Sequence, residues 1–216
     1  MLVCNMISYR AKTPFWMKFF FPQGLVWEMP QTAEPTVYIT FDDGPHPFAT
    51  QFALDQLKKH NAKATFFCVG ENVTKYPDVY EQVLNNGHVT ANHTFNHLNG
   101  WKTENNIYLE NIDKAAGYIK GKLFRPPYGK IKWAQAKLIR RKYPNNKIIM
   151  WSILSCDFDK KFSGQQCIEN VIKNIKPGSI VIFHDSEKAW DRMSFALPKV
   201  LDYCQKQGWE MKSIPN

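Results

Sequence analysis

Short apolar runs alternate with amphipathic stretches along most of this chain. The runs predict strands over residues 37–41, 64–69, 122–124, 147–154, 179–183 and 210–214. Apolar residues spaced three and four apart predict helices over residues 50–60, 77–86, 103–119, 131–142, 163–174 and 194–207, the third of them capped by Thr103. Strands that alternate with helices pair in parallel. The pattern therefore predicts an α/β fold, and about seven strands in this length favour a deformed or incomplete (β/α) barrel.

The chain is predicted to form one domain behind an N-terminal extension. Its 216 residues suit a single core, and no repeat or Gly/Ser/Pro-rich linker divides them. We expect residues 35–216 to form the domain and residues 1–34 to pack on it. The aromatic stretch 14–21 has a second interpretation, a shallow contact with a membrane surface. No run approaches the ~20 apolar residues of a membrane helix, and no cleavage site follows the stretch, which predicts a cytoplasmic location.

Composition and charge narrow the class of protein. A content of 44% hydrophobic and 22% charged residues excludes a disordered chain. The five cysteines form no C-x-x-C pair, which argues against a disulfide framework or zinc ribbon and favours a reducing compartment. The net charge of +9 comes from residues 114–147, where 11 basic residues meet no acidic one. This basic stretch is either a solvated helix face or a contact for an anionic glycan or a membrane surface. It lacks the basic–aromatic pattern of a nucleic-acid module, so no nucleic-acid partner is expected.

Polar, reactive residues follow several of the predicted strands. These are the Asp42–Asp43 pair, Arg125, Asp157 and His184, and His93 and His97 add two imidazoles within residues 92–97. In a parallel barrel the carboxyl ends of the strands form one rim. We therefore expect these groups to converge there.

His93 and His97 are four residues apart, which lets both imidazoles reach one ion. Asp43 would be a third ligand, and three protein ligands with an open position are typical of catalytic zinc. Two histidines and one carboxylate also suit the iron(II) of an oxygenase. A metal on Asp43 would leave Asp42 free as a general base beside a water whose pKa the ion lowers to ~7.

Amide hydrolysis also needs a proton for the leaving amine. His184 is the candidate acid, because the reference pKa of histidine, ~6.5, suits proton delivery. Asp157 would favour the charged imidazolium, and Arg125 would orient Asp42 through charge-assisted hydrogen bonds. A backbone N–H near Tyr128 would join the metal in holding the oxyanion.

Four ordered motifs, at residues 40–45, 92–97, 125–129 and 182–185, resemble those of the polysaccharide deacetylases. This is carbohydrate esterase family four, with the NodB-homology domain, and the resemblance covers about residues 35–215. It implies a deformed (β/α) barrel and metal-dependent removal of acetyl groups from N-acetylated sugars such as those of chitin or peptidoglycan. Some members of the family remove O-acetyl groups from xylan instead. The expected partner is therefore a glycan that contains N-acetylglucosamine.

The resemblance also implies a role for each matching residue. Asp42 resembles the catalytic base, and His184 resembles the acid. Asp43, His93 and His97 resemble the ligands of a single divalent metal, usually zinc. The remaining roles fall to residues around these groups: Arg125 orients the base, Asp157 pairs with the acid, Tyr128 supplies the oxyanion N–H, Ile182 lines the acetyl methyl pocket, and Pro127 lies on the substrate side.

Between the last two of these motifs the family has a further one, the fourth in chain order, and residues 154–158 depart from its pattern. Leu154 replaces a polar residue and Phe158 replaces a tryptophan, so the indole N–H is lost while an apolar wall remains. This change bears on substrate fit. It leaves two alternatives to an N-deacetylase: an O-acetyl ester hydrolase acting on a glycan, and a glycan-binding protein that has lost catalysis.

Overall fold

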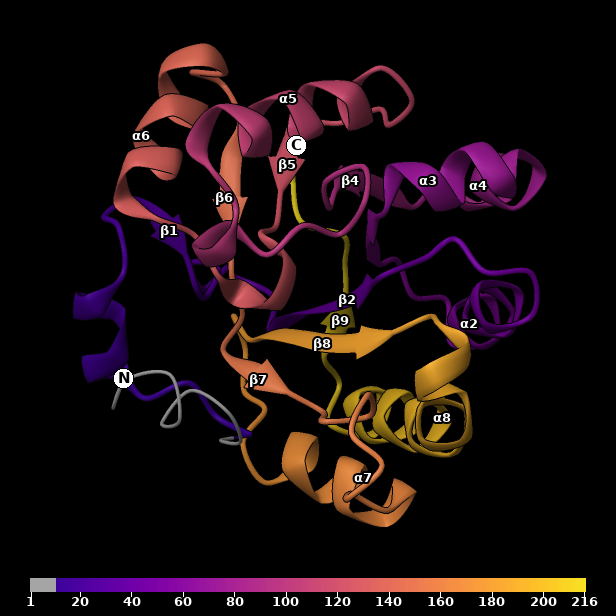
Figure 1. Ribbon diagram of the computed structural model, residues 1–216. Helices are drawn as coiled ribbons and strands as arrows, with labels where there is room; N and C mark the ends of the chain where they lie inside the picture. The colour runs from indigo at the N-terminus through magenta and orange to yellow at the C-terminus, as the bar shows by residue number, and fades with distance from the viewer. Residues whose placement is uncertain (1–10) are drawn as a thin grey trace.

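A computed structural model describes residues 11–216 and shows a curled sheet surrounded by helices (Figure 1). The sheet has nine strands in the order β1-β6-β5-β4-β3-β2-β8-β7, with β9 paired to β2, and all these strands pair in parallel. The predicted α/β fold, an incomplete (β/α) barrel of parallel strands, is confirmed. The strands are β1 (Leu25–Val26), β2 (Thr36–Asp42), β3 (Thr65–Cys68), β4 (Val89–Asn92), β5 (Leu123–Phe124), β6 (Lys147–Ile149), β7 (Ile153–Leu154), β8 (Ile180–His184) and β9 (Glu210–Met211).

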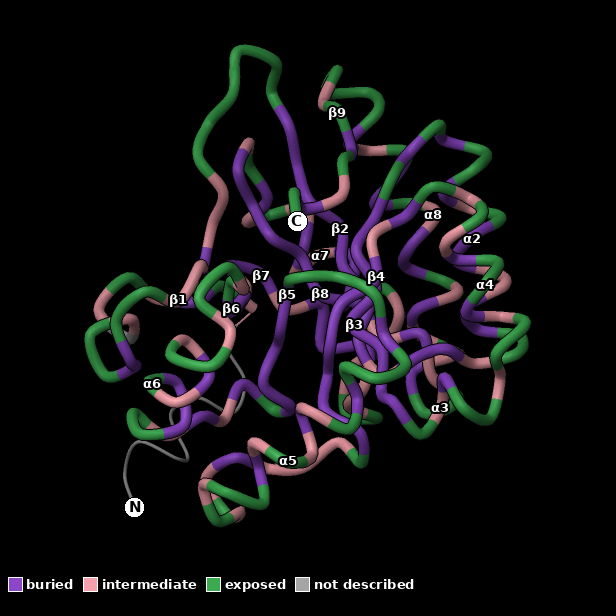
Figure 2. Tube along the Cα trace, turned by 90° about the horizontal axis from the view of Figure 1, so that it is seen from above, coloured by how far each residue is buried: buried purple, intermediate pink, exposed green. Residues whose placement is uncertain are grey.

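Helices cover the outside of the curled sheet. The burial pattern places buried residues along the strands and on the inner faces of the helices, with exposed residues on the outer faces and loops (Figure 2). No helix among residues 11–216 combines the length and the hydropathy needed to cross a membrane. The helices are α2 (Ala49–Lys59), α3 (Gly70–Lys75), α4 (Pro77–Asn85), α5 (Asn105–Ala116), α6 (Trp133–Lys142), α7 (Gly164–Ile172) and α8 (Trp190–Lys206), with short 3₁₀ helices η1 (Phe15–Phe20), η2 (Gly100–Lys102), η3 (Pro127–Gly129) and η4 (Glu187–Ala189).

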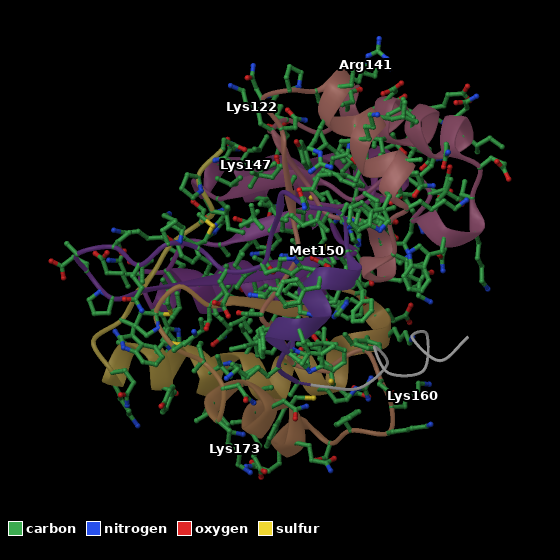
Figure 3. All side chains as sticks on the ribbon, turned by 90° about the vertical axis from the view of Figure 1, so that its left-hand side faces the viewer. Lys122, Arg141, Lys147, Met150, Lys160 and Lys173 are labelled. Carbon is green, nitrogen blue, oxygen red and sulfur yellow. The ribbon has the colours of Figure 1, made fainter. Side chains whose placement is uncertain are left out.

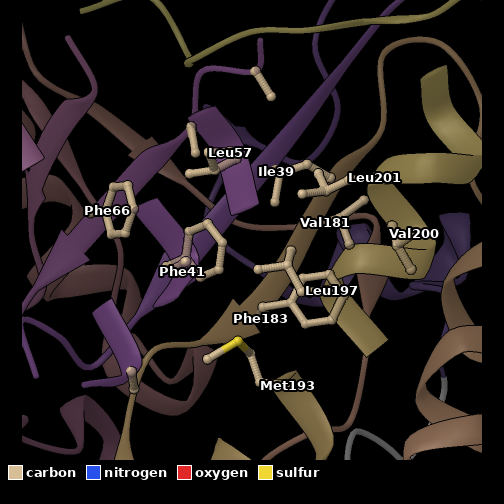
Figure 4. Packing of buried hydrophobic residues seen from close by; sticks show 14 of the residues in the cluster. Ile39, Phe41, Leu57, Phe66, Val181, Phe183, Met193, Leu197, Val200 and Leu201 are labelled. Carbon is tan, nitrogen blue, oxygen red and sulfur yellow. The ribbon is translucent and has the colours of Figure 1, made fainter. Parts of the chain in front are cut away.

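The largest apolar cluster lies between the sheet and helices α2 and α8 (Figure 4). Every residue of β2 is buried, as a strand covered on both faces requires. Phe41 of β2 stacks on Phe66 of β3, with ring centroids 4.8 Å apart, and Leu197 of α8 is fully buried beside them. This packing fixes β2, the strand that carries Asp42 and Asp43 at its end.

The segment 11–28 joins the two edges of the sheet. Leu25–Val26 forms edge strand β1, paired with β6, while Lys12 bridges Ile153 of the opposite edge strand β7. Between these contacts Phe21 and Trp27 pack with buried Met150. The segment therefore spans the gap left in the barrel between β1 and β7. Residues 1–10 of the predicted extension lie outside the described residues.

Two predictions about local structure are wrong, and some elements were not predicted. The apolar run 147–154 is not one strand but two. β6 pairs with β5 and β1 near one end of the strand order, whereas β7 pairs with β8 at the other end. Thr103 does not cap α5, which begins after Glu104, because its hydroxyl donates to the Asn99 carbonyl at 2.8 Å. The sequence patterns also missed α3 and β4; in β4, buried Thr90 and Asn92 interrupt the apolar pattern.

Candidate active site

A pocket of about 410 Å³ opens at the carboxyl ends of β2, β4 and β8. It brings together seven of the ten residues predicted for the site, while Arg125 and Asp157 lie behind it and Pro127 is buried at the start of η3. The lining consists of Asp42, Asp43, His93, His97, Tyr128, Gly129, Lys130, Trp151, Leu154, Phe158, Ile182, His184 and Lys188.

Asp42 is held by a fully buried arginine. Arg125 follows β5 and donates from Nη1 to Asp42 Oδ1 at 2.6 Å and to the Thr40 hydroxyl at 2.7 Å. Its Nη2 donates to the Met150 carbonyl at 3.0 Å, and its guanidinium lies 3.9 Å from the centre of the Phe67 ring. These contacts orient the guanidinium, which in turn aims the second Asp42 oxygen at the pocket. Charge-assisted bonds of this kind are short and directional.

Asp43, His93 and His97 form a cluster suited to a metal ion. One ligand atom from each lies within 4.8 Å of the other two. Asp43 Oδ1 is 3.2 Å from His97 Nε2 and 3.8 Å from His93 Nε2. His93 Nδ1 lies 2.8 Å from the Arg125 carbonyl, which only accepts, so the proton sits on Nδ1 and Nε2 is free to bind a metal.

The electrostatics of this cluster favour the protonation states in which His93 and Asp43 can bind a metal ion. Burial lowers the pKa of His93 to about 4, which keeps its imidazole neutral. Burial alone would raise the pKa of Asp43, but the hydrogen bond from His97 and the charges of the surrounding histidines hold it well below its usual range. A neutral imidazole and an ionised carboxylate are the forms that bind a divalent ion.

His184 ends β8 and pairs with buried Asp157. Its Nδ1–H donates to Asp157 Oδ1 and its backbone N–H donates to Oδ2, each at 2.7 Å. Burial would lower the pKa of His184, but the charge and hydrogen bond of Asp157 outweigh it and raise the pKa to about 9. His184 is therefore an imidazolium at neutral pH, with Nε2 carrying a proton that it can donate. Arg192 donates to the Asp157 carbonyl at 2.6 Å and so fixes the loop that carries this carboxylate.

Tyr128 lies in η3 with its side chain 56% exposed at the mouth of the pocket. Its φ of +59° is left-handed, a conformation that costs energy for a residue with a side chain. Its hydroxyl lies 3.1 Å from His97 Nδ1. Ile182 of β8 gives the pocket an apolar wall.

Left-handed backbone gathers around the site. Of six residues other than glycine with positive φ among the described residues, Asp43, His97 and Tyr128 line the pocket, and Thr94 and Cys156 are neighbours of site residues in the sequence. Such strain persists only where surrounding contacts hold it, and it concentrates at functional sites.

The motif analysis did not assign a role to Asp185. Its carboxylate accepts from the Gly44 N–H at 3.1 Å and from the Thr50 hydroxyl at 2.5 Å. A Cβ at Gly44 would collide with this carboxylate, so the sharp turn after Asp43 needs glycine. Burial raises the pKa of Asp185 to about 8. Through its bond to the Gly44 N–H, Asp185 thus holds the loop that follows Asp42 and Asp43.

The pocket is also lined by residues outside the predicted set of catalytic and metal-binding groups. Leu154 and Phe158 of the divergent fourth motif both line the pocket, and Phe158 meets the His184 ring edge-on at 5.1 Å. Lys130 and Lys188 also line it. The tryptophan that lines the pocket is Trp151, whereas Trp101, Trp133 and Trp190 are not among the lining residues.

Comparisons with known proteins point to one family. Residues 30–142 match the family described as Polysaccharide deacetylase. A peptidoglycan-N-acetylglucosamine deacetylase of Bacillus cereus is 38% identical over 201 residues, which cover 89% of this chain and 92% of the relative. A chitooligosaccharide deacetylase of Azorhizobium caulinodans is 32% identical, over 84% of this chain and 94% of the relative.

A solved structure extends the similarity to the fold. The crystal structure of the Bc1960 peptidoglycan N-acetylglucosamine deacetylase superposes with a TM-score of 0.83 and 32% sequence identity. The match covers 94% of this chain and 95% of that one. The similarity therefore extends over nearly the whole length of both chains.

Proposed function

This chain belongs to the polysaccharide deacetylase family, and from that premise we propose that it hydrolyses the acetamide of N-acetylated sugars in a glycan and releases acetate. The resemblance inferred from the four motifs is thereby confirmed. The observation that carries the proposal is the presence, in one pocket, of Asp42 and His184 together with the Asp43/His93/His97 cluster. Hydrolysis of an amide needs a base, an acid and a means of stabilising an oxyanion.

The chain's residues divide this chemistry. A divalent ion held by Asp43, His93 and His97 would polarise the acetyl carbonyl and acidify a water molecule. Asp42 accepts the proton from the attacking water, in the orientation that Arg125 imposes. His184 donates a proton to the sugar nitrogen as the C–N bond breaks, so the products are acetate and a free amine. The Tyr128 N–H supports the developing oxyanion, and Ile182 packs against the acetyl methyl group.

We further propose zinc as the metal. Two nitrogen ligands and one carboxylate with an open position suit catalytic zinc. The same set suits iron(II), but an oxygenase has no use for the Asp42–Arg125 and His184–Asp157 pairs. Metal analysis of the purified protein, with oxygen consumption as the second readout, distinguishes these two assignments.

Acetate release from N-acetylglucosamine oligomers of several lengths tests the proposed reaction. We expect release that zinc supports and a chelator abolishes. Release from acetylated xylan but not from these oligomers would favour the O-acetyl ester hydrolase. Binding of oligomers without release, under every metal tried, would favour the protein that has lost catalysis.

A charged substrate is the finer prediction for the basic stretch. Of its residues, Lys130 lines the pocket, and Lys188 of η4 lines it too, next to Phe158. We propose that these two lysines contact anionic groups on sugars beside the reacting one. Lys130→Gln and Lys188→Gln are expected to lower kcat/KM about tenfold on a carboxylate-bearing glycan and to spare a neutral oligomer. Equal losses on both substrates would contradict this contact.

A cytoplasmic location stays a prediction. Fractionation of cells that express the full chain, followed by detection of the protein in each fraction, tests it directly. Recovery outside the cytoplasm would contradict it.

A further inference from the structure

The 3₁₀ helix η1 presents an unusual concentration of exposed rings. The exposed fractions are 74% for Phe15, 75% for Phe19 and 59% for Phe20. Among the large hydrophobic side chains whose burial the structure describes, these three are the most exposed, and all belong to one helix of six residues. Scattered single apolar residues need no explanation, but a contiguous patch marks an interaction site.

The rings cannot simply turn inward, because the helix is anchored from its other side. Phe21 and Trp27, both buried, meet edge-on with ring centroids 5.1 Å apart, and buried Met150 packs with them. Trp16 of η1 packs against the same cluster. One side of this segment therefore packs against the barrel, and the three phenylalanines are exposed to solvent.

The surroundings of the patch are basic. Residues 11–27 contain Lys12 and Lys18 and no acidic residue. Arg140, in the last turn of α6, donates to the Gln23 carbonyl, which places the basic end of α6 beside this segment. Figure 3 looks onto this face, with η1 near its middle and Arg141, Lys147, Lys160 and Lys173 toward its edges.

We propose that η1 docks this protein on an anionic phospholipid surface. Exposed rings without hydrogen-bonding groups, in a segment that carries Lys12 and Lys18 and adjoins Arg140, match a bilayer, whose apolar interior lies beneath negative headgroups. A double-stranded nucleic acid would offer the phenylalanines of this patch no unpaired bases to stack on.

Docking would bring the active site close to the membrane. Trp151 packs on the Phe21/Trp27/Met150 cluster beneath η1 and also lines the catalytic pocket. Leu154, another pocket residue, is tied to the same segment: its backbone N–H donates a hydrogen bond to the Ala11 carbonyl at 2.8 Å. The proposal rests on η1 and its surroundings and does not depend on which glycan is hydrolysed.

Co-sedimentation of the full chain with vesicles tests the proposal. We expect binding to phosphatidylcholine vesicles that contain phosphatidylglycerol, weak binding to phosphatidylcholine alone, and loss of binding as salt screens the charges. The triple variant Phe15→Ser/Phe19→Ser/Phe20→Ser keeps the net charge and is expected to bind about tenfold more weakly.

A matched control removes exposed apolar side chains elsewhere. Ile107 on α5 and Phe195 on α8 are 54% and 46% exposed, and Ile107→Ser/Phe195→Ser should bind vesicles as the parent does. Thermal unfolding and acetate release, unchanged in both variants, would show that each remains folded.

Three results would overturn the proposal. The first is an absence of binding to anionic vesicles. The second is equal binding by the triple variant, which would leave only the general attraction of a basic protein. The third is a dimer in light scattering that the triple variant dissociates, because a second copy of the chain would then be the occupant of the patch.

Discussion

The carboxylate of Asp157 receives two hydrogen bonds from His184, one from the ring Nδ1 and one from the backbone nitrogen, both at 2.7 Å. The second bond fixes the position of the carboxylate relative to the end of β8, so the first can fix the orientation of the imidazole. This double contact joins two residues 27 positions apart and determines the charge of the proposed acid.

Replacing Asp157 by Asn should move the alkaline limit of activity. The pKa of His184 is raised to about 9, and without the carboxylate charge this pKa should fall. His184 would then lose its proton, and the enzyme its activity, at a lower pH than in the parent. The profile of kcat/KM against pH measures this shift. Because the folded pKa lies above the ordinary 6.5, the stability contributed by the pair is complete below pH 6.5 and is lost as the pH rises through about 9. An unchanged alkaline limit would remove His184 from the role of acid.

Replacing Asp42 by Asn should separate metal binding from catalysis. The amide is nearly isosteric but does not accept a proton, so turnover should fall about 10²–10⁴-fold. Asp43, His93 and His97 remain, and the zinc content should stay the same. Full activity in this variant would show that another group is the base.

Replacing Arg125 by Met should destabilise the protein by about 3–5 kcal/mol, because Asp42 would be left buried without its partner. Denaturant unfolding measures the loss. In an Asp42→Asn background the same substitution should cost less, since no charge is stranded. Equal costs in the two backgrounds would mean that the ion pair is not the source of the effect.

Zinc should stabilise the folded chain through the Asp43/His93/His97 cluster. At a free zinc concentration about 100 times the Kd, mass action contributes about 2.7 kcal/mol and raises Tm. His97→Gln should reduce this rise, whereas His60→Gln, at a histidine paired with Asp202 outside the pocket, should not. A Tm that responds equally in both variants would place the metal elsewhere.

The closing segment should be part of the folding unit. Trp27 is buried against Phe21 and Met150. Trp27→Ala should lower the free energy of unfolding by about 3–5 kcal/mol. Phe19→Ala, at an exposed ring of the same segment, should stay within about 0.5 kcal/mol of the parent. Similar effects of the two substitutions on the free energy of unfolding would argue that residues 11–28 are a detachable extension.

The placement of the catalytic groups followed from sequence alone because it depends on a local rule. Parallel strands end on one rim, so Asp42 and His184 had to meet there once their strands were recognised. The strand before His93, β4, was missed, and His93 was assigned to the site by its motif and its spacing from His97. The four motifs then assigned chemistry to each group. These inferences needed only residue type, order and the periodicity of short segments.

Other features were decided by contacts between distant parts of the chain. Asp185 lies 141 positions from Gly44 and 135 from Thr50, and the pairing of Lys12 with Ile153 joins parts of the chain that are as widely separated. The same holds for the division of 147–154 into β6 and β7, which pair with strands near opposite ends of the strand order. Periodicity records which faces of a segment are apolar, but it does not record which neighbour those faces meet. Tertiary packing therefore determined how the barrel closes, which tryptophan reaches the pocket, and which rings remain in water.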